Sequence, residues 1–271
     1  MRTLFVVLDA VNYSYSHILN FKDFYKYECI ANCNWTLPSI FSMITGLTTP
    51  ELLLYSIKDK GKIWRAGMCF HTYRTIFDDY KISKKYSFLP ILSKINVNTS
   101  KKEIIKQIEK DINVTVNEES LIIFIHLRGG HFVMSKHHFI HKTYEEELKF
   151  CYGEINPIIE KYREIFDNIV ITSDHGSKTD LKKYKFPIGK HFDEETLHVP
   201  IWSSHPLTFQ GEGILSSDNI FNILNMDKVI RTKDFVISAY PCFGRRNKVA
   251  ISYEYEGNII VKEVELNEIL L

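Results

Sequence analysis

Residues 167–177, DNIVITSDHGS, carry a strand pattern that ends in ionisable side chains. The apolar, β-branched run 168–172 is typical of a central strand in a parallel sheet, which is buried on both faces. Asp174 and His175 follow at the point where that strand would end. The stretch therefore predicts a buried strand with a carboxylate and an imidazole at its carboxyl end.

Two other runs have the same form. Residues 3–8 are apolar and end at Asp9, and residues 121–125 are apolar and end at His126. Parallel strands end at one edge of a sheet, and ligands bind at that edge in open α/β folds. We therefore expect the polar residues that follow all three runs to meet at one edge.

Helical stretches separate these runs and a fourth, shorter apolar run at residues 199–202. Residues 39–46, 101–111 and 144–166 have the turn signals, the charge pattern or the apolar spacing of helices. Strands that alternate with helices predict an α/β fold. We expect an αβα sandwich around a mostly parallel central sheet.

The C-terminal segment has a different pattern. Residues 248–255 and 258–265 alternate apolar and polar side chains around a Glu-Gly dipeptide, which predicts an antiparallel hairpin. No linker-like or repetitive stretch interrupts the chain. We therefore expect residues 1–271 to form a single catalytic domain, with residues 245–271 as a β-hairpin appendage.

The composition is that of a soluble globular protein and excludes several classes. The 271 residues are 45% hydrophobic and 25% charged, and their net charge is +1. A net charge this small provides no overall positive potential that would attract nucleic acid. No apolar run reaches the length of a transmembrane segment. Five scattered cysteines without a CxxC pair argue against a disulfide framework. The N-terminus has no signal-peptide pattern, so we expect a cytoplasmic protein.

The adjacent Asp174 and His175 offer an oxygen and an imidazole nitrogen, ligands that suit zinc or manganese. Asp9 would add a second carboxylate at the same edge. A strand-end acid can instead cap a helix, and each carboxylate taken alone leaves that alternative open. We expect a divalent metal here, with zinc as the first choice and manganese as the second.

Residues 34–39, NWTLPS, predict the start of a helix, with Thr36 at the capping position and Pro38 in the first turn. The amides at a helix N-terminus favour an anion. A hydroxyl there, beside a metal that lowers its pKa, would be a nucleophile that faces a phosphate. The alternative is a threonine that only caps the helix.

The stretch 126–131, HLRGGH, places His126 and His131 on either side of a glycine pair. Such a loop is flexible enough to bring both rings to one ligand. Arg128 between them could bind a phosphate or lie on the surface. We expect the histidines that follow to belong to a solvated loop, and these are His137, His138 and His141.

Five blocks along the chain together resemble the sulfatase-like branch of the alkaline phosphatase superfamily. They are VVLDAVNYS (6–14), NWTLPSIFSMITGLTTPE (34–51), IHLRGGHF (125–132), DNIVITSDHGS (167–177) and HFDEETLHVPIW (191–202). The motifs are most similar to those of phosphoethanolamine and phosphoglycerol transferase catalytic domains. The resemblance implies an alkaline-phosphatase-like fold.

The resemblance also implies a role for each matching residue. Asp9, Thr36, Asp174 and His175 match the positions that hold the main catalytic metal, and Thr36 is also the nucleophile in this match. Metal-dependent phosphoester chemistry through a covalent threonine intermediate is therefore implied.

Histidines match the remaining functional positions of the family. His126 and His131 match the paired histidines of lipid A phosphoethanolamine transferases, and His191 matches a histidine that binds the transferred group or a second metal. His198, in the HVP element, is a weaker match and could be a scaffold residue instead.

The sequence departs from two related patterns. Sulfatases need Cys or Ser at the nucleophile position and an Arg four residues later, where this chain has Thr36 and Ile40. The paired acids of the sulfatase calcium site are Asp9 and Ala10 here. Leu127 stands where two-zinc phosphatases carry Asp, so a second metal site is incomplete.

We therefore expect a metal-dependent phosphoester hydrolase or phosphotransferase that acts through Thr36. The expected substrate is a phosphodiester or substituted phosphate that is a small molecule or is linked to a sugar or lipid. Surface-polysaccharide or lipid modification would use such a substrate. His126, His131 and His191 would stabilise the phosphoryl oxygens or the leaving group. Two alternatives stay open, namely a sulfatase-like hydrolase of sulfate esters and a non-catalytic binding protein on the same fold.

Overall fold

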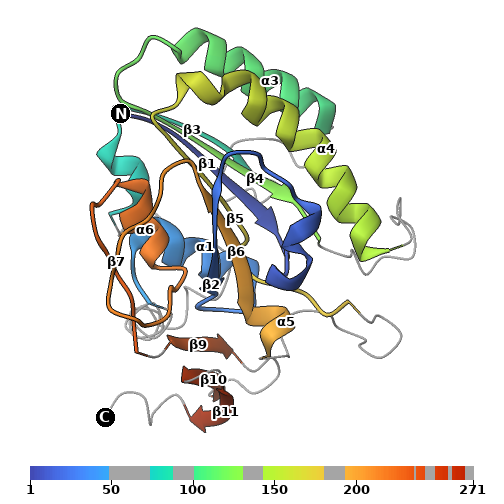
Figure 1. Ribbon diagram of the computed structural model, residues 1–271, viewed down its shortest axis with the longest axis vertical. Coiled ribbons are helices and arrows are strands. Elements are labelled where there is room, and N and C mark those ends of the chain that lie inside the picture. Colours follow the sequence, from blue (N-terminus) through green and yellow to red (C-terminus); the bar gives the residue numbers. More distant parts are fainter. Residues whose placement is uncertain are drawn as a thin grey trace.

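A six-stranded sheet in the order β2-β6-β5-β1-β4-β3 forms the centre of the computed structural model, which describes residues 1–48, 74–87, 101–130, 143–179, 193–234, 236–241, 248–255 and 258–265 (Figure 1). Strands β3, β4, β1 and β5 run parallel, whereas β6 is antiparallel to its neighbours β5 and β2. The mostly parallel sheet expected from the sequence is confirmed. The strands are β1 (Arg2–Asp9), β2 (Tyr25–Ile30), β3 (Ile82–Ser87), β4 (Leu121–Arg128), β5 (Asn168–Thr172) and β6 (His198–Ser203).

Helices cover both faces of this sheet, so the predicted αβα sandwich is confirmed. Helices α3 (Lys101–Thr115) and α4 (Tyr144–Tyr162) pack on one face, and α1 (Thr36–Thr45) and α6 (Asn219–Leu224) pack on the other (Figure 1). Short helical turns complete the described part of the chain, namely η1 (Tyr13–Ile18), η2 (Ile76–Asp79), η3 (Arg163–Ile165) and α5 (Glu194–Leu197).

Strand β1 lies in the middle of the sheet and is buried on both faces, which explains its uninterrupted apolar sequence. Side chains alternate along a strand, so β1 contributes to both halves of the core. Leu4, Val6 and Leu8 pack against α3 and α4, whereas Phe5 and Val7 pack against α1 and α6. Asp9 continues the alternation and therefore projects on the α1 side.

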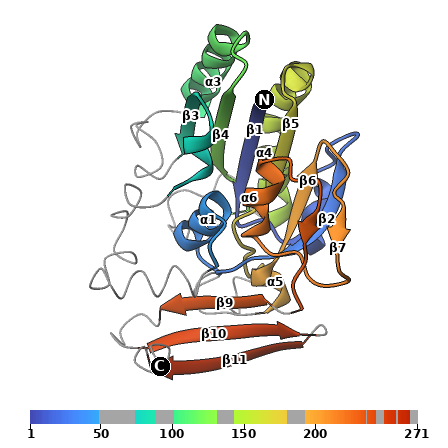
Figure 2. The same cartoon turned by 90° about the vertical axis from the view of Figure 1, so that its left-hand side faces the viewer.

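Two smaller sheets follow. Strands β10 (Lys248–Tyr255) and β11 (Asn258–Glu265) form the predicted antiparallel hairpin, and β9 (Val236–Pro241) adds a third strand to it. This sheet lies beyond the end of the molecule at which the parallel strands terminate (Figure 2). Strands β7 (Phe209–Gln210) and β8 (Ile230–Arg231) form a short parallel pair.

Strands β2, β3 and β9 are not predicted from the sequence. Strands β2 (YKYECI) and β3 (ISKKYS) are the two edges of the central sheet, and their charged residues break the continuous apolar pattern of the inner strands. Charged side chains on edge strands protect a sheet from pairing with other chains. No helix among the described residues is both long enough and apolar enough to span a bilayer.

Candidate metal centre

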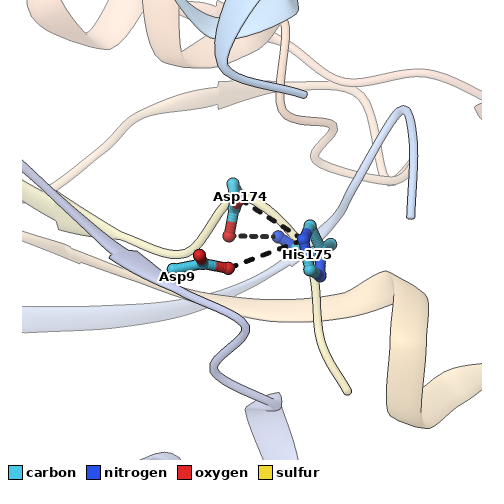
Figure 3. Close-up of side chains that lie close together, drawn as sticks. All are labelled: Asp9, Asp174 and His175. Carbon is cyan, nitrogen blue, oxygen red and sulfur yellow. Dashed lines mark hydrogen bonds and ion pairs between the residues drawn. The ribbon is translucent and has the colours of Figure 1, made fainter. Parts of the chain in front are cut away.

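Three ionisable side chains meet at the carboxyl edge of the central sheet (Figure 3). Asp9 is the last residue of β1, and Asp174 and His175 lie two and three residues beyond the end of β5. The Nε2 atom of His175 is 3.6 Å from Oδ1 of Asp9 and 3.4 Å from Oδ2 of Asp174. All three side chains are buried. The predicted convergence of these strand ends therefore brings two carboxylates and one imidazole together.

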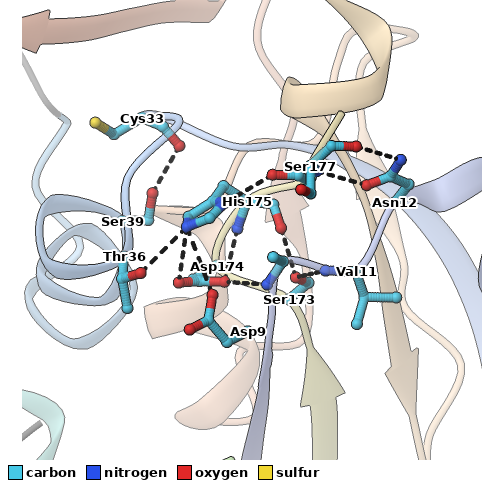
Figure 4. A network of polar contacts seen from close by, with 12 residues as sticks. Asp9, Val11, Asn12, Cys33, Thr36, Ser39, Ser173, Asp174, His175 and Ser177 are labelled. Atoms are coloured by element: carbon cyan, nitrogen blue, oxygen red, sulfur yellow. Dashed lines mark hydrogen bonds and ion pairs between the residues drawn. The ribbon is translucent and has the colours of Figure 1, made fainter. Parts of the chain in front are cut away.

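Thr36 reaches the same group from the other side (Figure 4). It is the first residue of α1, and its Oγ1 atom lies 3.1 Å from Nε2 of His175. The N-cap of α1 is Trp35, one residue earlier than the sequence indicates, and it makes no side-chain capping bond. The hydroxyl of Thr36 is therefore directed at the ionisable cluster.

Hydrogen bonds to the backbone fix the orientation of His175 and Asp174. The Nδ1 atom of His175 donates to the carbonyl oxygen of Gly176 at 2.7 Å, because a carbonyl oxygen can only accept. This bond leaves the Nε2 lone pair directed at the cluster. Oδ1 of Asp174 accepts from the backbone N–H groups of Ala10 and His175 at 3.0 and 2.9 Å, and this turns Oδ2 toward the cluster.

The donor set fits a divalent cation. Three atoms with lone pairs converge within 4.8 Å of one another, and Oδ2 of Asp174 accepts no hydrogen bond from any described residue. Two buried carboxylates cost free energy unless a positive charge compensates for them. Oxygen and imidazole ligands with a threonine hydroxyl beside them suit zinc or manganese.

Burial raises the pKa of Asp174 to about 6 from the ordinary value of 3.8; His175 opposes this effect and the charge of Asp9 adds to it. Between these values the folded state binds more protons than the unfolded chain, so stability must fall as pH rises. We expect the free energy of unfolding of the metal-free protein to decrease from pH 4 to pH 6, and Asp174→Asn to weaken this dependence. Urea unfolding at several pH values measures it, and equal slopes for both proteins would contradict it.

His126 lies on the same side of the sheet as Asp9. It is the register partner of Val7 in β1, and paired residues project on one face. Its buried Nδ1 atom lies 2.9 Å from Oγ of Ser87 in β3. Arg128 is the register partner of Asp9, two residues further along β4.

The remaining predicted histidines divide into two groups. His198 begins β6 and is bonded through Nδ1 to Oε1 of Glu28 at 2.5 Å. Its neighbour Val199 packs on the α1 side, so His198 projects on the opposite face from Asp9. The others lie outside the described residues, and these are His131, His191, His137, His138 and His141.

Cys33, three residues before Thr36, is fully buried, and burial raises the pKa of its thiol to about 12. Only a thiolate is an effective nucleophile, so this pKa argues against Cys33 as an attacking group. The described cysteines are free thiols, and these are Cys29, Cys33 and Cys151.

Several residues around the cluster have no role in the sequence patterns. Asn12 and Tyr144 hydrogen-bond to the loops that carry Asp9 and His175, and Ser173 accepts from the N–H of Val11 at 2.7 Å. Asn12 and Ser173 stand inside the quoted sequence blocks, but no spacing rule distinguishes a residue that bridges two loops from one that faces solvent.

Solved structures with a similar fold include three enzymes. One is the C-terminal periplasmic domain of the phosphoethanolamine transferase EptC from Campylobacter jejuni, at 12% identity and a TM-score of 0.55 over 83% of this chain and 88% of that one. A second is a 2-O GAG sulfatase, at 10% identity and a TM-score of 0.60 over 98% of this chain and 85% of that one. The third is the lipoteichoic acid synthase LtaP from Listeria monocytogenes, at 10% identity and a TM-score of 0.54 over 96% of this chain and 86% of that one. The chain has the alkaline-phosphatase-like fold.

The fold implied by the sequence blocks is thus confirmed. No protein-family model matches the sequence, and no curated protein does either. At 10–12% identity the three structures establish the fold alone, so the chemistry must be argued from the residues of the cluster.

Proposed function

We propose that the chain is a metal-dependent phosphoester hydrolase or phosphotransferase with Thr36 as its nucleophile. The observation that carries this proposal is the buried group formed by the Thr36 hydroxyl, the Nε2 lone pair of His175 and two carboxylates. An uncharged hydroxyl beside three metal-ligand atoms is the arrangement that an activated oxygen nucleophile requires. The phosphoethanolamine transferase and the lipoteichoic acid synthase among the structural neighbours support this reaction class.

Thr36 Oγ1 attacks phosphorus in the proposed reaction and its proton passes to solvent. The bond from phosphorus to the leaving-group oxygen breaks, and that oxygen takes the electron pair. A bound divalent cation would lower the pKa of that hydroxyl and neutralise charge on the phosphoryl oxygens. The start of α1 adds the positive end of a helix dipole beside Thr36. Attack of water on the phosphothreonine gives a hydrolase, and attack of a sugar or lipid hydroxyl gives a transferase.

Thr36 also distinguishes this reaction from sulfate-ester hydrolysis. One structural neighbour is a sulfatase, so the fold is compatible with either ester. Sulfatases resemble this chain but need Cys or Ser at the nucleophile position, and the nearby Cys33 is a buried thiol with a raised pKa. We therefore favour a phosphate substrate that is sugar-linked, lipid-linked or small. The cytoplasmic location remains a prediction from the sequence.

Turnover of three chromogenic esters tests the proposal. p-Nitrophenyl phosphate, bis-p-nitrophenyl phosphate and p-nitrophenyl sulfate are compared with zinc, with manganese and with a chelator. Release of p-nitrophenol from either phosphate ester, lost with the chelator, is the expected result. Turnover of the sulfate ester alone would overturn the phosphate assignment. A purified protein that neither retains nor binds zinc or manganese would favour a binding protein.

Asp9→Asn should weaken binding of zinc or manganese by more than 100-fold, because outer-sphere partners of a metal already account for about 10–100-fold. The substitution keeps the shape of the side chain and removes one of the two buried charges. Asp227→Asn is the matched control, since Asp227 is exposed. Titration against a chromophoric chelator measures both affinities, and equal affinities for the two variants would contradict the assignment of Asp9 as a ligand.

A further inference from the structure

The side chain of Asn12 joins the two loops that carry the candidate ligands (Figure 4). Asn12 lies three residues beyond Asp9 and is fully buried. Its Nδ2 atom donates to the carbonyl oxygen of Ser177 at 2.9 Å, and its Oδ1 atom accepts from the N–H of Ser177 at 2.6 Å. This two-bond pair fixes the loop after β1 against the loop after β5, two residues beyond His175.

Tyr144 also hydrogen-bonds to the loop after β1. It is the first residue of α4, and its buried hydroxyl donates to the carbonyl oxygen of Ala10 at 2.7 Å and accepts from the N–H of Asn12 at 2.9 Å. The hydroxyl also lies 3.1 Å from Oδ1 of Asn12. A capping box between Thr143 and Glu146 fixes the start of α4, so the tyrosine comes from a rigid element.

The loop after β1 needs such support because its backbone is strained. Ala10 has a φ of +59°, a left-handed conformation that is unfavourable for a residue with a Cβ atom. Its N–H donates to Asp174 and its carbonyl oxygen accepts from Tyr144, so both bonds hold it in place. Gly130 packs on the same junction, where a Cβ atom would overlap the Tyr144 ring and lie 2.5 Å from the Ala10 carbonyl oxygen.

We propose that Asn12 and Tyr144 are positioning residues that set the distance between Asp9 and the Asp174–His175 pair. The proposal rests on the metal site of the proposed function. It adds two residues whose side-chain hydrogen bonds go to Ala10, to Ser177 and to each other. Metal affinity depends on ligand spacing more steeply than folding does, since a ligand displaced by a fraction of an ångström stays buried but no longer coordinates well. Loss of the junction should therefore weaken metal binding out of proportion to stability.

Matched variants at the opposite ends of the same strands provide the controls. Tyr80 has a buried hydroxyl bonded to Thr3 of β1 and to the carbonyl oxygen of Leu224. Asn168 begins β5 and donates to the carbonyl oxygen of Ile223. Tyr80→Phe and Asn168→Ala therefore remove the same chemical groups at the amino edge of the sheet, far along β1 and β5 from the ligands.

The experiment measures zinc affinity by chelator competition and the Tm of the metal-free protein for the full chain and four variants. Tyr144→Phe and Asn12→Ala should weaken zinc binding 10–100-fold, whereas Tyr80→Phe and Asn168→Ala should stay within about twofold of wild type while all four lower Tm. Zinc affinities of Tyr144→Phe and Asn12→Ala that match those of the controls would overturn the positioning role. A wild-type chain that binds neither zinc nor manganese would overturn the metal site itself, and the positioning role with it.

Discussion

Thr36→Ala should lower phosphoester turnover by about 10³-fold or more, because it removes the atom that forms the covalent intermediate. The hydroxyl of Thr36 faces the cluster, and its Oγ1 atom lies 3.1 Å from His175 Nε2. Asp9, Asp174 and His175 remain in the variant, so zinc should still bind, although more weakly if the hydroxyl is also a ligand. Initial rates with bis-p-nitrophenyl phosphate and zinc titration on the same samples measure both effects.

Thr36→Ser is the matched control for this loss. It keeps an oxygen nucleophile at the start of α1 and should retain far more activity than Thr36→Ala. The outcome that would contradict a nucleophilic Thr36 is specific: metal-dependent turnover in Thr36→Ala within tenfold of wild type. In that case a water molecule rather than the threonine would have to attack phosphorus directly.

Gly176→Ala should destabilise the protein by about 3 kcal/mol or more, the upper range for inserting a methyl group into packed structure. A Cβ atom on Gly176 would overlap the carbonyl oxygen of Glu195 and lie 2.8 Å from Oδ1 of Asn12. Both neighbours are held, because the Gly176 N–H donates to the Thr196 carbonyl oxygen at 2.9 Å and Asn12 is paired with Ser177. The loop beside His175 must therefore move. Urea unfolding with and without zinc measures the change.

Gly153→Ala is a control for which the expected change in stability has the opposite sign. Gly153 is exposed in the interior of α4, and a Cβ atom there would meet nothing within 4 Å. Alanine is the better helix former by about 0.5–1 kcal/mol, so this variant should be more stable than wild type. If Gly176→Ala were as stable as wild type, the close packing of the His175 loop on α5 would be wrong.

The sequence predicts the centre of this site for a simple geometric reason. Apolar runs that end in Asp9 and in Asp174 and His175 are adjacent parallel strands, and parallel strands bring their ends to one edge. Thr36 lies on a helix whose position depends on tertiary packing, so periodicity alone could not place it. Its assignment came from the resemblance of the surrounding block to a family motif.

Other features depend on relations that a single sequence does not contain. The face on which His198 projects depends on the register between β6 and its neighbour β2, and a single sequence does not contain that register. Asn12 and Tyr144 meet only because α4 begins beside the loop after β1, 132 residues away in the chain. Strands β2 and β3 are not predicted because they lie at the edges of the sheet, where charged side chains are tolerated. Their sequences therefore lack the continuous apolar pattern of the inner strands.

The central position of β1 has a consequence for how the protein acquires its chemistry. Both neighbours of β1 in the sheet, β4 and β5, are more than 100 residues away in sequence, and Asp9 meets Asp174 only after β5 has paired. Such long-range pairings form late and slowly during folding. A growing chain that has not yet reached His175 therefore cannot assemble the candidate ligand set. A cation that binds only the folded state stabilises it by an amount that rises with the ratio of cation concentration to Kd. Cation binding would in this sense report that β1 and β5 have paired.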